Sequence, residues 1–225
     1  MSSRRETSVN RDQVNIVIVG LSGQGIVMFG KLLSSVFAHA EHKVTTFDVL
    51  GTAHRGTQVY SQIRISRAAN ISNLIPTGAA DVVVGMEPLE TLRAGAYYLA
   101  DGGWAIYNTH KIIPMYASIG RDFTSDKPRP LGYPSLEFIK KTFEEDMGAT
   151  TIPLDATAMA EEAGHSAAAN TVLLGAMLRT GLVPASKESV LGAIEQLVPA
   201  GTAGLNQRAF EMGYTYQPAA AARVG

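Results

Sequence analysis

The chain has 225 residues, of which 46% are hydrophobic and 17% charged, and its formal net charge is −1 at pH 7. This length suffices for one large domain or two small ones, and the balanced charge without a basic stripe argues against a nucleic-acid partner. The chain contains no cysteine, which excludes disulfides, cysteine-ligated iron–sulfur clusters and thiol catalysis within it. No apolar run approaches the roughly 18 residues of a membrane span and no signal peptide is recognisable, so we expect a cytoplasmic protein without a membrane partner.

The first regular element is a buried strand that leads through a glycine-rich turn into a helix. Residues 14–19 are mostly β-branched and apolar, as in a strand of a parallel sheet that is covered on both faces. Gly20, Gly23 and Gly25 allow a tight turn, and residues 24–41 have the apolar spacing of a helix. The first N–H groups of a helix lack partners inside it, so an anion site at this turn is possible.

Further strands and helices alternate along the chain. We expect strands at residues 43–48, 58–66, 81–85, 103–108 and 150–154, and helices at 87–99, 135–147, 157–163, 167–180, 187–197 and 203–212. This order predicts an α/β fold, namely a Rossmann-like, mostly parallel twisted sheet flanked by helices, with a helical C-terminal part. We expect a flexible tail at 1–12, a single domain at 13–213 with a long proline-rich loop at 114–134, and a C-terminal arm at 214–225.

Binding residues are expected at the carboxyl ends of the strands, because ligands of open α/β sheets bind in the crevice there. The segments that should gather at this edge are residues 20–25, 48–57, 85–87 and 108–110. In the second segment, His54 and Arg55 stand among small residues. The arginine could hold a phosphate or carboxylate, or it could cap a helix or pair with an acid of a partner, and both interpretations stay open.

The glycine turn allows three interpretations. As a dinucleotide site it keeps Gly20 and Gly25 but has Ser22 at the middle glycine of the G-x-G-x-x-G pattern, and Asp48 would bind the ribose. As a triphosphate loop it fails, because Leu32 replaces the Ser or Thr that binds Mg²⁺. The third interpretation is a subunit of a larger enzyme that uses the turn differently. No side chain stands out as a catalytic base, and no spacing indicates a metal site.

Three motifs in a fixed order resemble one known family. They are GLSGQG at residues 20–25 with GKL at 30–32, HRGTQVYSQIRIS at 54–66, and ADVVVG at 80–85. Together they resemble the γ subunit or γ domain of 2-oxoacid:ferredoxin (acceptor) oxidoreductases, in which a G-x-G-G-Q-G turn precedes an R-G-G segment and a strand. Ser22 and Thr57 stand where that pattern has glycine. Both residues are small, so we expect the turn to keep its shape.

The resemblance implies a subunit of a multi-subunit enzyme of the pyruvate, 2-oxoglutarate, indolepyruvate or arylglyoxylate type. Such an enzyme oxidatively decarboxylates a 2-oxoacid to an acyl-CoA and passes the electrons to ferredoxin or another acceptor. Thiamine diphosphate, Mg²⁺ and [4Fe-4S] clusters are then implied in α, β and ferredoxin-like partner subunits, in agreement with the absence of cysteine here. Among the substrates we favour an aromatic 2-oxoacid.

For this chain, the resemblance implies contact with coenzyme A and no catalytic residue. The candidate cofactor-binding residues are Ser22, Gly23, Gln24, Gly25, Thr52, His54, Arg55 and Gly56. The first loop would line the site through backbone and amide groups, and the second would face coenzyme A or the substrate. The alternative is a free-standing Rossmann-like NAD(P)-binding protein, and a scaffold subunit without a ligand is a third hypothesis.

Overall fold

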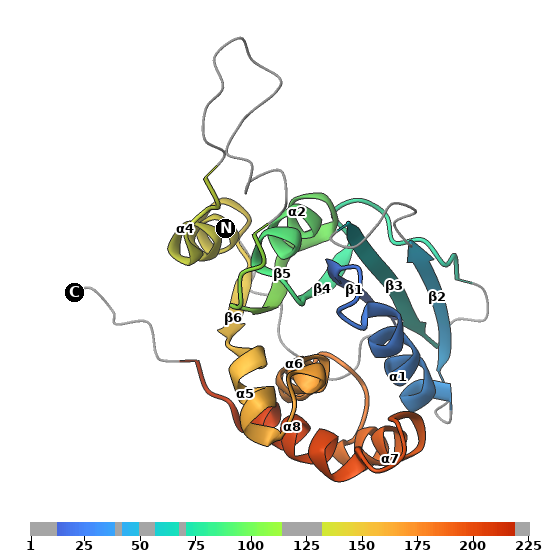
Figure 1. Cartoon of the computed structure of the whole chain (residues 1–225). Coiled ribbons are helices and arrows are strands. Elements are labelled where there is room, and N and C mark those ends of the chain that lie inside the picture. The colour runs from blue at the N-terminus through green and yellow to red at the C-terminus, as the bar shows by residue number, and fades with distance from the viewer. Residues whose placement is uncertain (1–12, 39–41, 50–56, 68–70, 114–131, 219–225) are drawn as a thin grey trace.

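The computed structural model describes residues 13–38, 42–49, 57–67, 71–113 and 132–218. Six strands form one sheet in the order β2-β3-β1-β4-β5-β6 (Figure 1). They are β1 (Gln13–Leu21), β2 (Lys43–Val49), β3 (Gln58–Ser66), β4 (Ala80–Gly85), β5 (Leu99–Asn108) and β6 (Thr150–Leu154). Strands β1, β4, β5 and β6 are parallel neighbours, whereas β3 runs antiparallel to both β1 and β2. The predicted mostly parallel sheet is confirmed, with β3 as its reversed strand.

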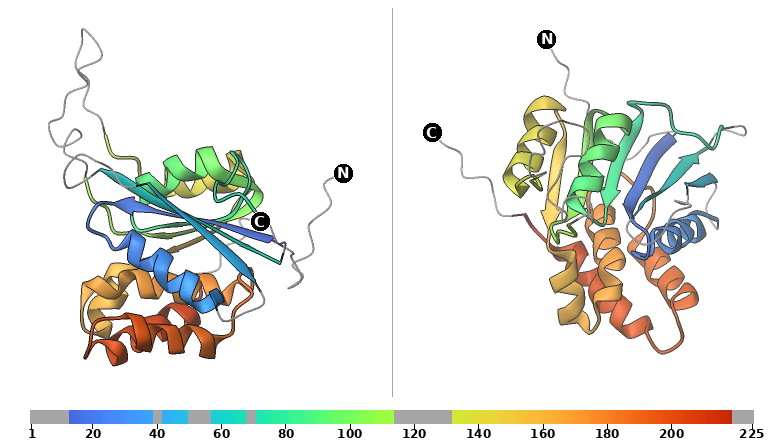
Figure 2. Two further views of the ribbon diagram at one scale, coloured as in Figure 1. Left: turned by 90° about the vertical axis from the view of Figure 1, so that its right-hand side faces the viewer. Right: turned by 45° about the horizontal axis from the view of Figure 1, so that its top comes forward.

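Helices cover both faces of the sheet (Figure 2). Helix α2 (Pro88–Tyr98) and the short α4 (Leu136–Lys141), which continues into the π-helical turn η1 (Thr142–Asp146), lie on one face. On the other face lie α1 (Ile26–Ala38), α5 (Ala156–Ala163), the 3₁₀ turn η2 (Ser166–Ala168), α6 (Ala169–Arg179), α7 (Lys187–Leu197) and α8 (Ala203–Thr215). Across the described ranges, no helix has both the length and the apolar character that crossing a membrane requires.

The side chains of β1 divide between the two faces. Ile16 and Ile18 belong to the large cluster beneath α1 and the C-terminal helices, whereas Val17 and Val19 pack with Val83 on the α2 side. Successive side chains of a strand point to opposite faces, so a strand covered on both sides must be apolar at every position. The apolar run at residues 16–19 thus has its physical cause in this double cover.

Helix α6 is the buried centre of the C-terminal part. Every residue from Thr171 to Leu178 is buried, as predicted for a helix that is apolar nearly all round. Its backbone touches that of α8 at two glycines. A Cβ on Gly175 would collide with the carbonyl oxygen of Phe210, and a Cβ on Gly213 would collide with the backbone of α6. The close approach of α6 and α8 therefore depends on the absence of these side chains.

Several predicted elements differ in extent from the observed ones, among them two helices. The helix expected over residues 135–147 is divided into α4 and the wider turn η1. The helix expected over residues 203–212 continues as α8 to Thr215. Tyr214, where we expected an extended arm to begin, is therefore helical. The ammonium group of Lys187 lies 5.1 Å from the centre of its ring, which holds this last turn against α7.

We expect Gly175→Ala to lower the free energy of unfolding by about 1–3 kcal/mol, because the added methyl group must push α8 away from α6. The matched control is Gly192→Ala within α7, where an added Cβ meets no atom within 4 Å. There the change should raise the free energy of unfolding by about 0.5–1 kcal/mol, as for an unobstructed glycine inside a helix. Urea unfolding of the full chain measures both values, and equal effects would contradict the close helix contact.

Candidate functional site

The glycine turn between β1 and α1 lies at the carboxyl edge of the sheet, beside the ends of β4 and β5 (Figure 1). Because β1, β4, β5 and β6 are parallel, the segments that follow them gather at this edge, as predicted. Strand β3 starts here, and the N–H of Ser22 donates to the carbonyl oxygen of Thr57 at 2.9 Å. Thr52, His54, Arg55 and Gly56 lie outside the described residues, so their part in the site stays a prediction.

The side chain of Gln24 holds the turn in place. Its Oε1 accepts a hydrogen bond from the N–H of Leu21 at 2.7 Å, and its Nε2 donates to the carbonyl oxygen of Met86 at 3.2 Å. A Cβ on Gly20 would lie 2.7 Å from this Oε1, so a side chain there would displace the amide. We expected Gln24 to line the site through its amide. In the structure, this amide instead bridges the end of β1 and the residue that follows β4.

The turn and the start of α1 offer backbone hydrogen-bond donors. Gly23 and Gly25 have φ angles of +98° and +75°, a conformation that residues with a Cβ rarely adopt. A Cβ on Gly23 would meet no atom of the described residues within 4 Å, so this side of the turn is open toward the described part of the chain. The N–H groups of Ile26 and Val27 have no partner inside α1, and its first turn carries no acidic residue. With the exposed Ser22 beside them, these donors suit an anion such as a phosphate.

Asn108, the last residue of β5, connects the residue after β4 to the start of α5. Its buried Nδ2 donates to Thr157 Oγ1 at 2.8 Å and to the carbonyl oxygen of Met86 at 3.4 Å. Its Oδ1 accepts from the N–H of His110 at 3.2 Å. The Met86 carbonyl thus receives the amides of both Gln24 and Asn108. Asn108 was a candidate for ligand binding by its position at this edge, but its amide is occupied within the chain.

The segment expected at this edge, residues 85–87, contains a buried carboxylate that sequence reasoning did not single out, Glu87. It caps α2 by accepting from the N–H of Glu90 at 2.9 Å, and its Oε1 accepts from the hydroxyl of Tyr133. The N–H of Ile112 approaches the same oxygen at 3.5 Å. Burial and the bond to Glu87 raise the pKa of Tyr133, so the hydroxyl remains the donor. Pro88, at the first helical position, was the signal in the sequence for a cap at residue 87.

Asp48 does not lie beside the glycine turn. It belongs to β2, and β3 lies between β2 and β1. Adjacent strands are about 4.8 Å apart, which places Asp48 roughly 10 Å from β1. Its Oδ1 instead accepts from Ser61 Oγ on β3 at 2.5 Å. In a dinucleotide-binding fold the second strand is the direct neighbour of the first. The observed strand order therefore argues against the NAD(P) alternative.

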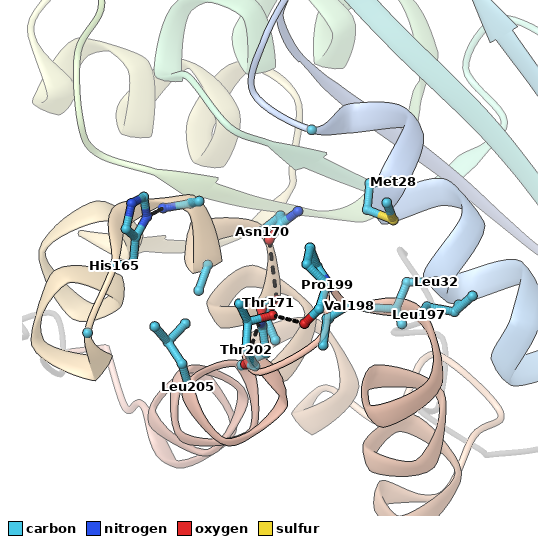
Figure 3. A pocket seen from close by; sticks show the side chains of 15 residues that line it. Met28, Leu32, His165, Asn170, Thr171, Leu197, Val198, Pro199, Thr202 and Leu205 are labelled. Carbon is cyan, nitrogen blue, oxygen red and sulfur yellow. Dashed lines mark hydrogen bonds between the residues drawn. The ribbon is translucent and has the colours of Figure 1, made fainter.

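A cavity of about 470 Å³ opens between α1 and the C-terminal helices, next to the glycine turn (Figure 3). The turn and α1 contribute Gly25 and Met28, the start of α6 contributes Asn170 and Thr171, and the segment between α7 and α8 contributes Pro199. Among the described residues that line the cavity, none carries a carboxylate. No motif reveals it, because its walls come from segments that are far apart in the sequence.

Comparison with known proteins agrees with this geometry. The model of the pyruvate ferredoxin/flavodoxin oxidoreductase family matches residues 15–216. The chain belongs to this family. Indolepyruvate oxidoreductase subunit IorB from Thermococcus kodakarensis is 36% identical over 201 residues, which are 89% of this chain and 94% of that relative. The resemblance predicted from the three motifs is confirmed, and the chain is a γ-type subunit of a 2-oxoacid oxidoreductase.

Solved structures of related proteins share the fold. Pyruvate oxidoreductase subunit PORC from Thermotoga maritima is 24% identical with a TM-score of 0.65, and the match covers 91% of this chain and 96% of that one. The 2-oxoglutarate:ferredoxin oxidoreductase from Magnetococcus marinus is 18% identical with a TM-score of 0.65. That match covers 91% of this chain but 31% of the other, so the same fold also occurs as one part of a longer chain.

We expect Gln24→Leu to lower the free energy of unfolding by about 1–3 kcal/mol, because the N–H of Leu21 and the carbonyl of Met86 both lose a partner. The exposed neighbour Ser22 provides the control. Ser22→Ala should stay within about 0.5 kcal/mol of the wild type in urea unfolding. A small effect of Gln24→Leu would show that the turn keeps its shape without the amide bridge.

We expect Glu90→Gln to become more stable relative to the wild type as the pH rises from about 4 to about 7. Burial raises the pKa of Glu90 and is the largest cause; Arg93 at 2.8 Å lowers it, and Glu87 raises it further. The folded chain thus favours the protonated carboxyl of Glu90. The stability that this preference provides is fully present below the ordinary pKa of a glutamate, and it is lost as the pH rises through the raised pKa of Glu90 in the folded chain. Urea unfolding at both pH values, corrected with the exposed Glu162→Gln, measures the difference. A difference in stability between Glu90→Gln and the wild type that does not change with pH would contradict the raised pKa of Glu90.

Proposed function

We propose that this chain is the γ subunit of an indolepyruvate-type complex that oxidatively decarboxylates an aromatic 2-oxoacid to an acyl-CoA. Support comes from the IorB relative, whose match extends over nearly the whole of both chains. The chain has no cysteine, so partner subunits would hold the iron–sulfur clusters. We place thiamine diphosphate and Mg²⁺ in α and β partners as well. Electrons would reach ferredoxin or another acceptor through a ferredoxin-like partner, in the cytoplasm.

The role assigned to this chain is contact with the phosphates of coenzyme A at the glycine turn. The observation that carries it is the pair of positive-φ glycines, Gly23 and Gly25, at an open position before the first turn of α1. Backbone N–H groups at a helix start bind phosphate well, because the donors converge there and the helix dipole favours negative charge. The related Magnetococcus marinus enzyme has been solved with coenzyme A and succinyl-CoA bound.

The candidate residues would then have different tasks. Gly23 and Gly25 offer their backbone N–H groups, Ser22 adds a hydroxyl, and Gln24 fixes the turn through its two internal hydrogen bonds. From the second loop, Arg55 would add a charged donor, together with Thr52, His54 and Gly56. When bound, coenzyme A supplies the thiol that takes up the acyl group. This chain binds and orients it, and the redox chemistry takes place in the partners.

We expect Gly23→Ala to raise the KM of the assembled complex for coenzyme A about tenfold or more, since one hydrogen bond to a charged group contributes about 1.5–3 kcal/mol. The new Cβ would stand in the open space of the turn, and a φ of +98° would be strained. The matched control is Gly78→Ala. Gly78 has a φ of +69° and open space around its Cβ position, but it precedes β4 at the opposite edge of the sheet.

Steady-state kinetics of the complex with varied coenzyme A give the KM values. Equal increases for Gly23→Ala and Gly78→Ala would mean that backbone strain alone causes the effect. An unchanged KM in Gly23→Ala and in Arg55→Ala, with the partner subunits still co-purifying, would make this chain a scaffold without a ligand of its own. Either outcome contradicts the proposed contact.

A further inference from the structure

The cavity described above is continuous with the glycine turn. Gly25 lines it, and Asn170 Nδ2 lies 3.2 Å from the position that a Cβ on Gly25 would take. The amide of Asn170 therefore stands where the turn meets the cavity. Its Oδ1 lies 3.3 Å from the hydroxyl oxygen of Thr171, whose one proton is shared with the closer Asn206 Oδ1, and no acceptor for its Nδ2 is found among the described residues. A ligand bound at the turn can extend into the cavity and meet this open donor.

Most of the remaining lining residues are apolar, and the side chains of Thr171 and Asn206 among them are hydrogen-bonded within the chain. The hydroxyl of Thr171 donates to Asn206 Oδ1 at 2.8 Å, and Asn206 Nδ2 donates to the carbonyl oxygen of Thr202 at 3.0 Å. At the rim, the side chains of Met28 and Leu197 are 44% and 36% exposed, which is high for large apolar residues. Figure 3 shows Asn170 between Met28 on one side and the imidazole ring of His165 on the other. An apolar ligand with a polar edge that faces Asn170 fits this surface.

We infer that the cavity holds the adenine and ribose end of coenzyme A, an inference that rests on the proposed phosphate contact. The flat apolar faces of a purine fit the walls around Met28 and Pro199, and a side-chain amide such as that of Asn170 pairs with the polar edge of adenine. A volume of about 470 Å³ lies within the usual range of ligand pockets, roughly 300–1,000 Å³. No carboxylate among the described lining residues would repel the phosphates.

The geometry also decides which end of coenzyme A enters the cavity. Phosphates at the turn divide the molecule into a purine end and a thiol end. The thiol must reach the acyl group, and the proposed function places the site where that group forms in partner subunits. The thiol end therefore has to point out of this chain toward a partner. The cavity among the chain's own helices remains for the purine end.

The test uses the assembled complex and the exposed Ala167, which lines the cavity. Ala167→Trp fills the cavity from its rim and should raise the KM for coenzyme A about tenfold or more. The KM for phosphopantetheine, which has the thiol arm and a phosphate but no purine, should stay within about twofold. Inhibition by adenosine bisphosphate, which has the purine but no thiol arm, should weaken as the KM for coenzyme A rises. Ala158→Trp, at an exposed position of α5 outside the cavity, is the matched control and should leave all three values unchanged.

The outcomes separate this inference from the function on which it rests. If Ala167→Trp changes the KM for coenzyme A and for phosphopantetheine equally, or changes neither, the purine site is refuted. If Ala167→Trp loses its partner subunits on purification and Ala158→Trp keeps them, the cavity receives a partner's side chain and the inference is also overturned. Gly23→Ala acts on the phosphate that coenzyme A and phosphopantetheine share. A raised KM in Gly23→Ala with an unchanged KM in Ala167→Trp would therefore support the phosphate contact and refute only the purine site. If neither variant alters the KM for coenzyme A, both proposals fail.

Discussion

The amide of Gln24 ties the end of β1 to the residue after β4, and the geometry of the functional edge depends on this bridge. It forms because Gly20 leaves room for the amide against the strand. Once the bridge is made, Gly23 and Gly25 carry the chain through a left-handed turn, and α1 starts in a fixed direction. The same constraint thus sets the open N–H groups at the start of α1 and the position of Met28 in the neighbouring cavity.

Most polar side chains at the carboxyl edge serve the chain itself. Gln24, Asn108 and Glu87 each join segments that are distant in the sequence, and each uses its hydrogen-bonding groups in doing so. What the described part of this edge offers to a ligand is mainly backbone N–H. Such a surface suits an anion, as the proposed contact with the phosphates of coenzyme A requires.

The C-terminal helices do more than cover the sheet. Gly175 and Gly213 let α6 and α8 touch through their backbones, and the start of α6 lies close to the glycine turn. Asn170 lies beside Gly25, although the two residues are 145 positions apart in the sequence. A loosening of the α6–α8 contact would consequently reshape the cavity as well as the core.

The sequence by itself determined the types of the elements, the position of the turn and the family. These follow from local causes: the apolar run of β1, the glycines of the turn and the apolar surface of α6 each act through neighbouring residues. Only the tertiary structure decided that β3 separates Asp48 from the turn, that Met86 receives the amide of Gln24, and that Glu87 is buried. The cavity, too, is formed only by the tertiary structure. Strand order, hydrogen-bond partners and cavities depend on which distant segments pack together, and no local period in the sequence encodes that choice.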